Sequence, residues 1–133
     1  MKKLSFISIL ALVFLISSCV TTAKFPVSKV VPAADIVAKK KQDKNGNYKL
    51  TVTAKNLASA ERVSSEGKNY VVWVESASNE IRGIGRLINK NGETASIEAL
   101  VPFNFKVVFI TAEDKDEVSI PSGTEIARVE FIK

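Results

Sequence analysis

From Asp35 onwards, apolar and polar residues alternate in short runs that are separated by turn residues. The alternation is clearest between Tyr48 and Lys55, where every second residue is apolar and the residues between are lysines and threonines. A period of two with one apolar side is typical of a β-strand that is buried on one face. Related runs predict further strands over residues 35–41, 69–75, 80–89, 94–100, 105–111 and 124–132.

Turn signals separate these runs. Asn45-Gly46 and Asn91-Gly92 are pairs that favour hairpin turns, and Pro121-Ser122-Gly123 is a third turn signal. No long helical period occurs, although residues 58–63 are compatible with one helical turn. About seven short strands with regular turns predict an all-β fold, an antiparallel immunoglobulin-like β-sandwich over residues 35–133.

The segment Tyr70–Val74 is aromatic or β-branched throughout, which favours a strand that is covered on both faces. Trp73 lies on the third expected strand, the position of the core tryptophan in immunoglobulin-like sandwiches. The run over 105–111 is the most strand-like and is expected to be central. Because Cys19 is the only cysteine, we expect Trp73, Phe105, Phe109 and Leu50 to supply the stability that a disulfide gives elsewhere.

The first residues have a different pattern. Lys2 and Lys3 precede an apolar run, Leu4–Ile16, of 13 residues. As a helix this run would be about 20 Å long, short for a bilayer core of roughly 30 Å. A cationic start, a short apolar run and small residues after it are the three parts of a secretory signal peptide.

Ile16-Ser17-Ser18-Cys19 resembles the lipobox of bacterial lipoproteins. The resemblance implies that signal peptidase II recognises Ile16, Ser17 and Ser18, removes residues 1–18 as a signal peptide, and leaves Cys19 as the lipidated first residue. The protein would then be held at the membrane through its covalent lipid rather than by a spanning helix. An uncleaved anchor helix and an ordinary signal peptide are the two alternatives.

Residues 19–34 are predicted to be a flexible tether, because they are small and polar, contain Pro26 and Pro32, and show no period. In lipoproteins the residues after the cysteine influence the destination. Val20 stands where Asp would favour the inner membrane, and no acidic cluster follows. The resemblance therefore implies a lipid-anchored protein of the bacterial cell envelope, at the outer membrane and facing the periplasm.

A second resemblance lies in the expected strands and turns. Parts of the chain together resemble the extracytoplasmic C-terminal domain of anti-sigma-K factors, namely Tyr70–Val74, Gly85–Leu87, Gly92, Phe105–Thr111 with Glu113, and Ile120–Thr124. The likeness covers residues 68–126 and implies a β-sandwich outside the membrane. In that family, sigma-factor binding belongs to a separate cytoplasmic segment, which this chain lacks, so the resemblance implies the fold and no sigma-factor control.

The net charge of +5 falls to about +3 when Lys2 and Lys3 are removed. Such a charge favours solubility and does not indicate a nucleic-acid partner. Lys39-Lys40-Lys41 is the strongest basic cluster, and alternation places Lys40 on the opposite face from its neighbours. We interpret the cluster as protection of an edge strand, with binding of anionic lipid or polysaccharide as the alternative.

The residue types restrict the chemistry. The chain has no histidine, and Cys19 is used for the lipid, which excludes Ser-His-Asp and Cys-His nucleophiles and zinc sites built from His and Cys. Ser65 and Lys68 have the spacing of a Ser-Lys pair but lie in a glycine-containing loop. Glu75 and Glu80 flank a predicted hairpin and are the best candidates for a carboxylate pair of a glycosidase, although solvated strand ends explain them better.

Two segments have oxygen-bearing side chains of the kind that bind calcium. Residues 43–47 partly match a calcium loop but lack the required downstream glutamate, so a hairpin turn is the preferred interpretation. Residues 113–117, Glu-Asp-Lys-Asp-Glu, are either a calcium-binding loop or a solvated acidic loop. We assign no catalytic, cofactor-binding or metal-binding residues and expect no enzymatic activity.

Three functional hypotheses follow. The first is a non-catalytic, lipid-anchored envelope protein that acts as an interaction or structural module, with an envelope protein or glycan as partner. The second is a ligand-binding lipoprotein for glycan or calcium, which uses the loops over residues 56–68 and 113–117. The third is a carboxylate-type hydrolase.

Overall fold

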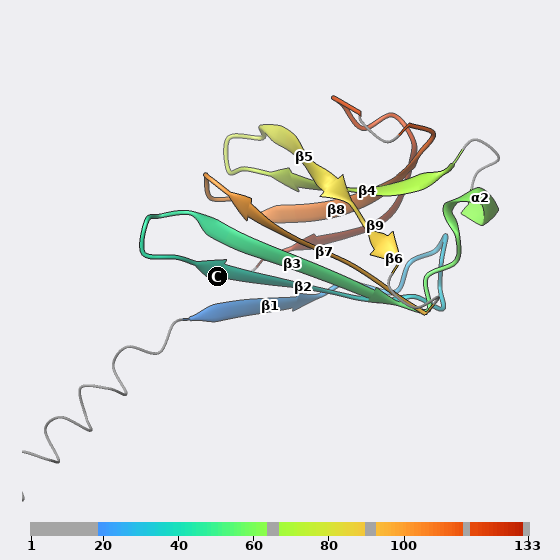
Figure 1. The fold of residues 1–133 in the computed structure, drawn as a ribbon, viewed down its shortest axis with the longest axis horizontal. Helices are drawn as coiled ribbons and strands as arrows, with labels where there is room; N and C mark the ends of the chain where they lie inside the picture. Colours follow the sequence, from blue (N-terminus) through green and yellow to red (C-terminus); the bar gives the residue numbers. More distant parts are fainter. Residues whose placement is uncertain (1–18, 64–66, 90–92, 116–117, 132–133) are drawn as a thin grey trace, which may run out of the picture.

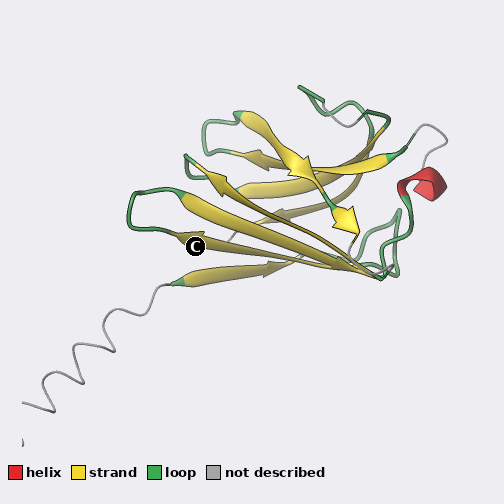
Figure 2. Cartoon of the chain, viewed as in Figure 1, coloured by secondary structure: helices red, strands yellow, loops and turns green. Residues whose placement is uncertain are grey.

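The computed structural model describes residues 19–63, 67–89, 93–115 and 118–131. Two β-sheets pack face to face, and one short helix lies at one end of the sandwich (Figures 1 and 2). The elements of the described part are β1 (Val20–Lys24), β2 (Asp35–Gln42), β3 (Tyr48–Lys55), α2 (Ala60–Val63), β4 (Asn69–Glu75), β5 (Ile81–Arg86), β6 (Ile88–Asn89), β7 (Thr94–Val101), β8 (Val107–Glu113) and β9 (Thr124–Glu130).

The first sheet has the strand order β1-β2-β3-β7-β6, and the second has the order β5-β4-β8-β9. Every paired strand is antiparallel to its neighbour. Without β1, this order is the one found in immunoglobulin-like sandwiches. The predicted all-β, antiparallel sandwich is confirmed. The described residues contain more strands than expected because β1 was not foreseen and the run over residues 80–89 divides into β5 and β6.

The main core lies between the sheets. Strict alternation in β3 places Leu50, Val52 and Ala54 in this core, and all three are fully buried. Val72 and Val74 of β4 contact the same core from the second sheet. Burial of each valine or leucine side chain stabilises the fold by about 1.5–3 kcal/mol, so this layer supplies much of the stability.

The segment over residues 20–34 is not the predicted flexible tether. β1 pairs with β2 along its whole length, from Val20 opposite Lys41 to Lys24 opposite Val37. After β1, Phe25 and Val31 are buried in the main core. The prediction was wrong because β1 has only five residues, too few for a visible period, and because the burial after it follows no regular spacing.

Buried Ser28 fixes this segment to the far side of the sandwich. Its hydroxyl donates a hydrogen bond to the carbonyl oxygen of Ile126 in β9. The Ser28 hydroxyl oxygen also accepts hydrogen bonds from the N–H groups of Val30 at 3.1 Å and Val31 at 3.0 Å. The domain therefore begins directly after Cys19 rather than at Asp35.

Trp73 is buried as predicted, but on the other face of its sheet. It belongs to a second, smaller apolar cluster on the outer face, with Val71, Val107 and Phe109, and Val118 packs against it. The Trp73 and Phe109 rings stack with their centroids 6.3 Å apart. Because β4 is apolar at five consecutive positions, alternation could not show which face each side chain takes.

Gly83 of β5 makes room for the Trp73 indole. A Cβ atom at Gly83 would lie 3.0 Å from an indole ring carbon, closer than a normal contact. A register shift between Val72 and Trp73 in the β4–β5 ladder lies at the same point. The ladder is therefore irregular beside Gly83, and this irregularity accommodates the ring.

The expected helical turn is observed as α2. None of the helices among the described residues is long and apolar enough to cross a membrane.

We expect Trp73→Ala to reduce the free energy of unfolding by about 3–5 kcal/mol, because it removes the largest side chain of the outer cluster. Trp73→Phe, which keeps an aromatic ring and loses the indole N–H, should cost less. Urea denaturation followed by circular dichroism measures both changes. Equal unfolding midpoints for wild type and Trp73→Ala would contradict the assignment of Trp73 to a packed cluster.

Candidate functional site

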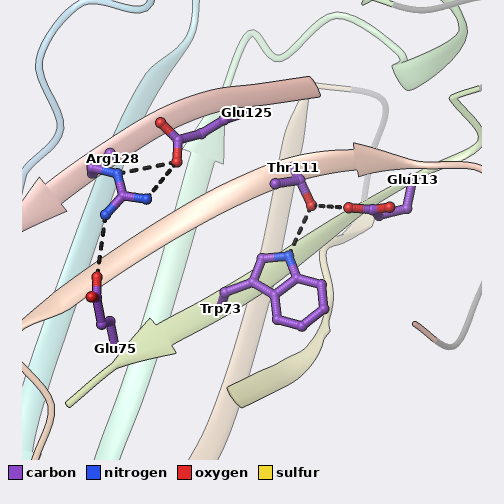
Figure 3. A network of polar contacts seen from close by, with 6 residues as sticks. All are labelled: Trp73, Glu75, Thr111, Glu113, Glu125 and Arg128. Atoms are coloured by element: carbon purple, nitrogen blue, oxygen red, sulfur yellow. Dashed lines mark hydrogen bonds and ion pairs between the residues drawn. The ribbon is translucent and has the colours of Figure 1, made fainter. Parts of the chain in front are cut away.

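The outer face of the second sheet carries a chain of buried polar contacts (Figure 3). The indole N–H of Trp73 donates a hydrogen bond to Thr111 Oγ1 at 2.8 Å. The Thr111 hydroxyl in turn donates to Oε2 of Glu113. Alternation in β8 places Thr111 and Glu113 on the same face as Phe109, so the strand itself brings these groups together.

The Glu113 carboxylate is the end point of this chain of contacts and is 1% exposed. It also accepts hydrogen bonds from the N–H of Ser122 at 3.2 Å, the Ser122 hydroxyl at 2.9 Å and the N–H of Gly123 at 3.0 Å. Burial raises the pKa of Glu113, but these hydrogen bonds outweigh it and hold the pKa below its ordinary value of 4.5. The carboxylate therefore ties the β8–β9 loop back onto β8.

Gly123 is required for this contact. A Cβ atom at Gly123 would lie 1.7 Å from the carbonyl oxygen of Ala112, so any side chain would force the loop away from β8. The predicted turn at Pro121-Ser122-Gly123 thus supplies two backbone donors to a buried carboxylate. The roles of Thr111 and Ser122 were not predicted from the sequence. The one sequence feature that pointed to this contact is Gly123, a turn glycine that follows a strand ending in polar residues.

This geometry argues against the calcium interpretation of the acidic loop. Glu113 is engaged by its own loop, and Asp116 and Glu117 lie outside the described residues. In the described part of the chain, no group of three or more His, Cys, Asp or Glu residues lies close enough together to hold a metal ion.

A second polar group lies on the same face, nearer the start of β8 (Figure 3). Arg128 contacts Glu125 at 2.7 Å and Glu75 at 3.4 Å, and its guanidinium lies 4.4 Å from the centre of the Phe109 ring. Its hydrogen bonds to Glu125 chiefly raise the pKa of Arg128. Arg128 therefore covers the edge of the outer apolar cluster.

The proposed carboxylate pair has a structural explanation. Glu75 is engaged by Arg128, and the N–H of Glu80 donates to the Ser76 hydroxyl in the β4–β5 turn. The Ser76 N–H also donates to the Glu80 carbonyl oxygen at 2.9 Å. Glu75 thus ends β4, and Glu80 lies in the turn directly before β5. Of the proposed Ser-Lys pair, Ser65 lies outside the described residues.

Residues 43–47 form the predicted hairpin turn between β2 and β3. The Asp43 carboxylate accepts hydrogen bonds from the N–H groups of Asn45 at 2.8 Å and Asn47 at 2.9 Å. Gly46 has a φ of +83°, the left-handed conformation that favours glycine. The carboxylate that a calcium loop would use as a ligand instead closes the turn.

Lys40 lies among three aromatic rings at the end of the sandwich where β1 begins. Its ammonium is 4.6 Å from the centre of the Phe105 ring, 5.0 Å from Tyr48 and 5.5 Å from Phe131. It donates hydrogen bonds to Asn104 Oδ1 at 2.5 Å and to the carbonyl oxygen of Phe105 at 2.6 Å. Burial lowers the pKa of Lys40. The ammonium thus joins β2 to the connection between β7 and β8.

The predicted orientation of Lys40 is observed, but the interpretation of the lysine cluster was wrong. Lys40 is opposite Leu50 in the β2–β3 ladder and so points inward, whereas Lys39 and Lys41 are exposed on the outer face. β2 is not an edge strand, because β1 covers it. Protection of an open edge therefore does not explain these lysines.

Cys19 is exposed and directly precedes β1. A cavity of 630 Å³ lies beside it and is lined by Cys19, Lys40, Asp43, Asn104, Lys106 and other residues of the same end. Of the predicted recognition residues, Ile16, Ser17 and Ser18 lie outside the described part of the chain. The structure thus places the candidate lipidation site at one corner of the sandwich.

A smaller cavity of 350 Å³ lies at the opposite end, where the segment between β3 and β4 meets β6 and β7. Its apolar lining includes Leu57, Ala58 and Leu87, and Arg86 and Glu93 are among its polar lining residues. The Tyr70 hydroxyl donates a hydrogen bond to the carbonyl oxygen of Ala58, and burial raises the pKa of Tyr70 to about 12. The described part of the loop over residues 56–68 is therefore held in place beside a mixed apolar and polar cavity.

We expect the stability to fall as the pH drops through the pKa of Glu113 in the folded chain. The pKa of Glu113 is lower in the folded chain than in the unfolded chain, where it is near 4.5. The ionised carboxylate therefore stabilises the fold fully above the unfolded-state pKa, and this stabilisation is lost as the pH falls through the folded-state pKa. Glu113→Gln should cost about 1–3 kcal/mol at neutral pH and flatten the acid limb of the profile.

The matched control is Glu98→Gln, which removes an exposed carboxylate in an ion pair with Lys49 and should change stability by at most about 0.5 kcal/mol. Urea midpoints between pH 3 and pH 7 (about the range in which carboxylates titrate) measure both variants. An unchanged acid limb in Glu113→Gln would contradict the assigned role.

We expect Lys40→Met to reduce the free energy of unfolding by about 1–2 kcal/mol, because it removes the ammonium that bonds to Asn104 and Phe105. The neighbouring variant Lys39→Met, at an exposed position, should stay within about 0.5 kcal/mol of wild type. Thermal unfolding of the two variants side by side tests this difference. Equal losses of stability in both variants would refute the assigned role of Lys40.

No protein-family model, no curated protein and no solved structure matches this chain, so the two family resemblances remain predictions from the sequence.

Proposed function

We propose that this chain is a lipid-anchored, non-catalytic protein of the bacterial cell envelope that acts as an interaction or structural module. One observation carries the proposal: Cys19, the residue that the lipobox-like segment designates, is exposed and is followed immediately by a strand of the sandwich. Lipid on Cys19 would attach the folded domain itself to the membrane, without an intervening tether. The outer membrane, on its periplasmic side, is the location that the residues after Cys19 favour.

The side-chain chemistry supports a role without bond making or breaking. Glu113, the buried carboxylate, is saturated by hydrogen bonds from its own strand and loop. Every buried side-chain nitrogen or oxygen of the described residues has a hydrogen-bond partner. Catalytic groups are typically held in strained or incompletely paired environments, and the polar groups described here are used for folding instead.

The resemblance to the extracytoplasmic domain of anti-sigma-K factors is consistent with this proposal. It implies a sandwich outside the cytoplasm, and the fold is the only property that we carry over from this resemblance.

A ligand-binding lipoprotein is the second candidate, and the cavity of 350 Å³ at the end opposite Cys19 favours it. The cavity has apolar walls with polar groups near them, which suits a small organic molecule such as a sugar unit better than a metal ion. Its position at the end opposite Cys19 also keeps it clear of the point where the lipid would be attached.

Expression of the full chain in bacteria tests the anchor. We expect mass spectrometry to find the chain starting at an acylated Cys19, and fractionation to place it with the membranes. Cys19→Ala should abolish acylation and leave residues 1–18 attached, and an inhibitor of signal peptidase II should block cleavage of the wild type.

Ser18→Ala is the matched control, because it keeps a small residue beside the cleavage point and should be acylated normally. An unmodified, water-soluble wild-type chain that retains residues 1–18 would refute the proposal.

A further inference from the structure

We infer that the outer face of the first sheet is the membrane-contacting surface of the anchored domain and that it binds anionic phospholipid headgroups. This inference rests on the proposed lipid anchor at Cys19. It concerns the orientation of the domain, which neither the lipobox-like segment nor the fold by itself determines.

The strand register defines this face. Residues opposite one another in a β-ladder point to the same side of the sheet. In β3, Leu50 and Val52 point into the core, so Lys49, Thr51, Thr53 and Lys55 point outward. The ladders of β3 with β2, of β2 with β1 and of β3 with β7 then place the remaining residues of the outer face, namely Val20, Thr22, Lys24, Asp35, Val37, Lys39, Lys41, Thr94, Ser96, Glu98 and Leu100.

The row nearest Cys19 combines apolar and cationic residues. This row has one residue from each of β1, β2, β3 and β7, and each residue pairs with the next in the ladder: Val20, Lys41, Lys49 and Leu100. Val20 is 49% exposed and Leu100 is 65% exposed, high values for large apolar side chains. Apolar side chains and lysines side by side suit the boundary between headgroups and acyl chains, where the apolar groups insert and the lysines meet phosphates.

The charge of the whole face is complementary to an anionic surface. It carries five lysines, at positions 24, 39, 41, 49 and 55, against the two acids Asp35 and Glu98. All five lysines are exposed. Among the described residues, Lys49 is the one of the five in an ion pair, with Glu98 at 2.5 Å. Each lysine held close to anionic lipid favours binding, and the effect falls off within a Debye length of about 8 Å.

The connection to the anchor brings this face to the membrane. Val20, the first residue of β1, follows Cys19 directly and belongs to the outer face. Figure 1 shows β1, β2 and β3 side by side in one layer, with the start of β1 at the same end as the β2–β3 turn. Acyl chains on Cys19 would therefore hold the corner of this layer at the bilayer, within reach of the lysines.

In the part of the chain that the structure describes, the outer face of the second sheet offers no comparable surface. Its centre is occupied by the buried cluster of Trp73 and Phe109, and Arg128 lies over the Phe109 ring. Glu75 and Glu125 are engaged by Arg128 on that side. The cationic excess is thus concentrated on the first sheet.

Lysine footprinting of the acylated full chain tests this orientation. The chain is reconstituted into vesicles of phosphatidylcholine alone or with about one-third phosphatidylglycerol, a fraction that gives an anionic surface, and is labelled with a membrane-impermeant amine reagent. Mass spectrometry before reconstitution establishes the acyl chains, so failure of the anchor is distinguished from failure of the orientation.

On the anionic vesicles we expect labelling of Lys39, Lys41 and Lys55 to fall at least about threefold relative to Lys115, an exposed lysine of the β8–β9 loop. On phosphatidylcholine alone, or on the anionic vesicles at about 0.5 M salt, where the screening length is about 4 Å, this protection should be largely lost. Lys41→Glu combined with Leu100→Ser should also abolish the protection of Lys39 and Lys55, whereas Lys68→Glu, at an exposed position just before β4 of the second sheet, should preserve it.

Other outcomes would overturn the inference. If the domain stands on its Cys19 end, Lys44 and Lys106 will be protected while Lys39 and Lys55 remain fully labelled. If the face binds a soluble anionic glycan or a protein instead, the five lysines will be labelled equally on both kinds of vesicle. If the chain carries no acyl group, the inference fails together with the proposed anchor.

Discussion

The structure depends on the burial of both faces of β4 and β8, the two central strands of the second sheet. One face of each strand packs against the first sheet, and the other packs in the cluster around Trp73 and Phe109. A strand without a solvated face has no place for an unpaired polar group, because such a group would be cut off from water. Thr111 and Glu113 are therefore tolerated only because the indole N–H and the donors of Ser122 and Gly123 satisfy them.

This arrangement replaces the usual device of immunoglobulin-like domains. In antibody domains, a tryptophan packs against a disulfide between the sheets. Here the tryptophan lies on the outer face of the second sheet, and the space between the sheets is filled by aliphatic side chains with Phe25, Tyr70 and Phe105. The carboxylate of Glu113 adds a long-range tie, since it joins the end of β8 to a loop about nine residues later. A chain with one cysteine, which can form no disulfide within itself, thus stabilises its second sheet with hydrogen bonds and ring stacking.

The sequence predicted those parts of the fold in which local pattern and tertiary structure agree. The strict alternation of β3 and the Asn45-Gly46 turn correctly predicted strands and their faces. The same period of two correctly placed Lys40 on the other face of the sheet from Lys39 and Lys41. β1 was missed because a five-residue strand shows no period and is held by its partner rather than by its own composition. The face of Trp73 and the partners of Glu113 were missed because both depend on residues distant in the chain, which no local pattern reveals.

The pairing of β1 with β2 has a mechanical consequence. If the domain is held at Cys19, any force that pulls it from its support enters through the first residue of β1. A pull along the strand loads all five register pairs of the β1–β2 ladder at once, whereas a pull across the sheet opens them one after another. The domain would therefore resist drag parallel to β1 far better than lifting away from the first sheet, and peeling of β1 would expose Phe25 and Val31 as the next groups to yield.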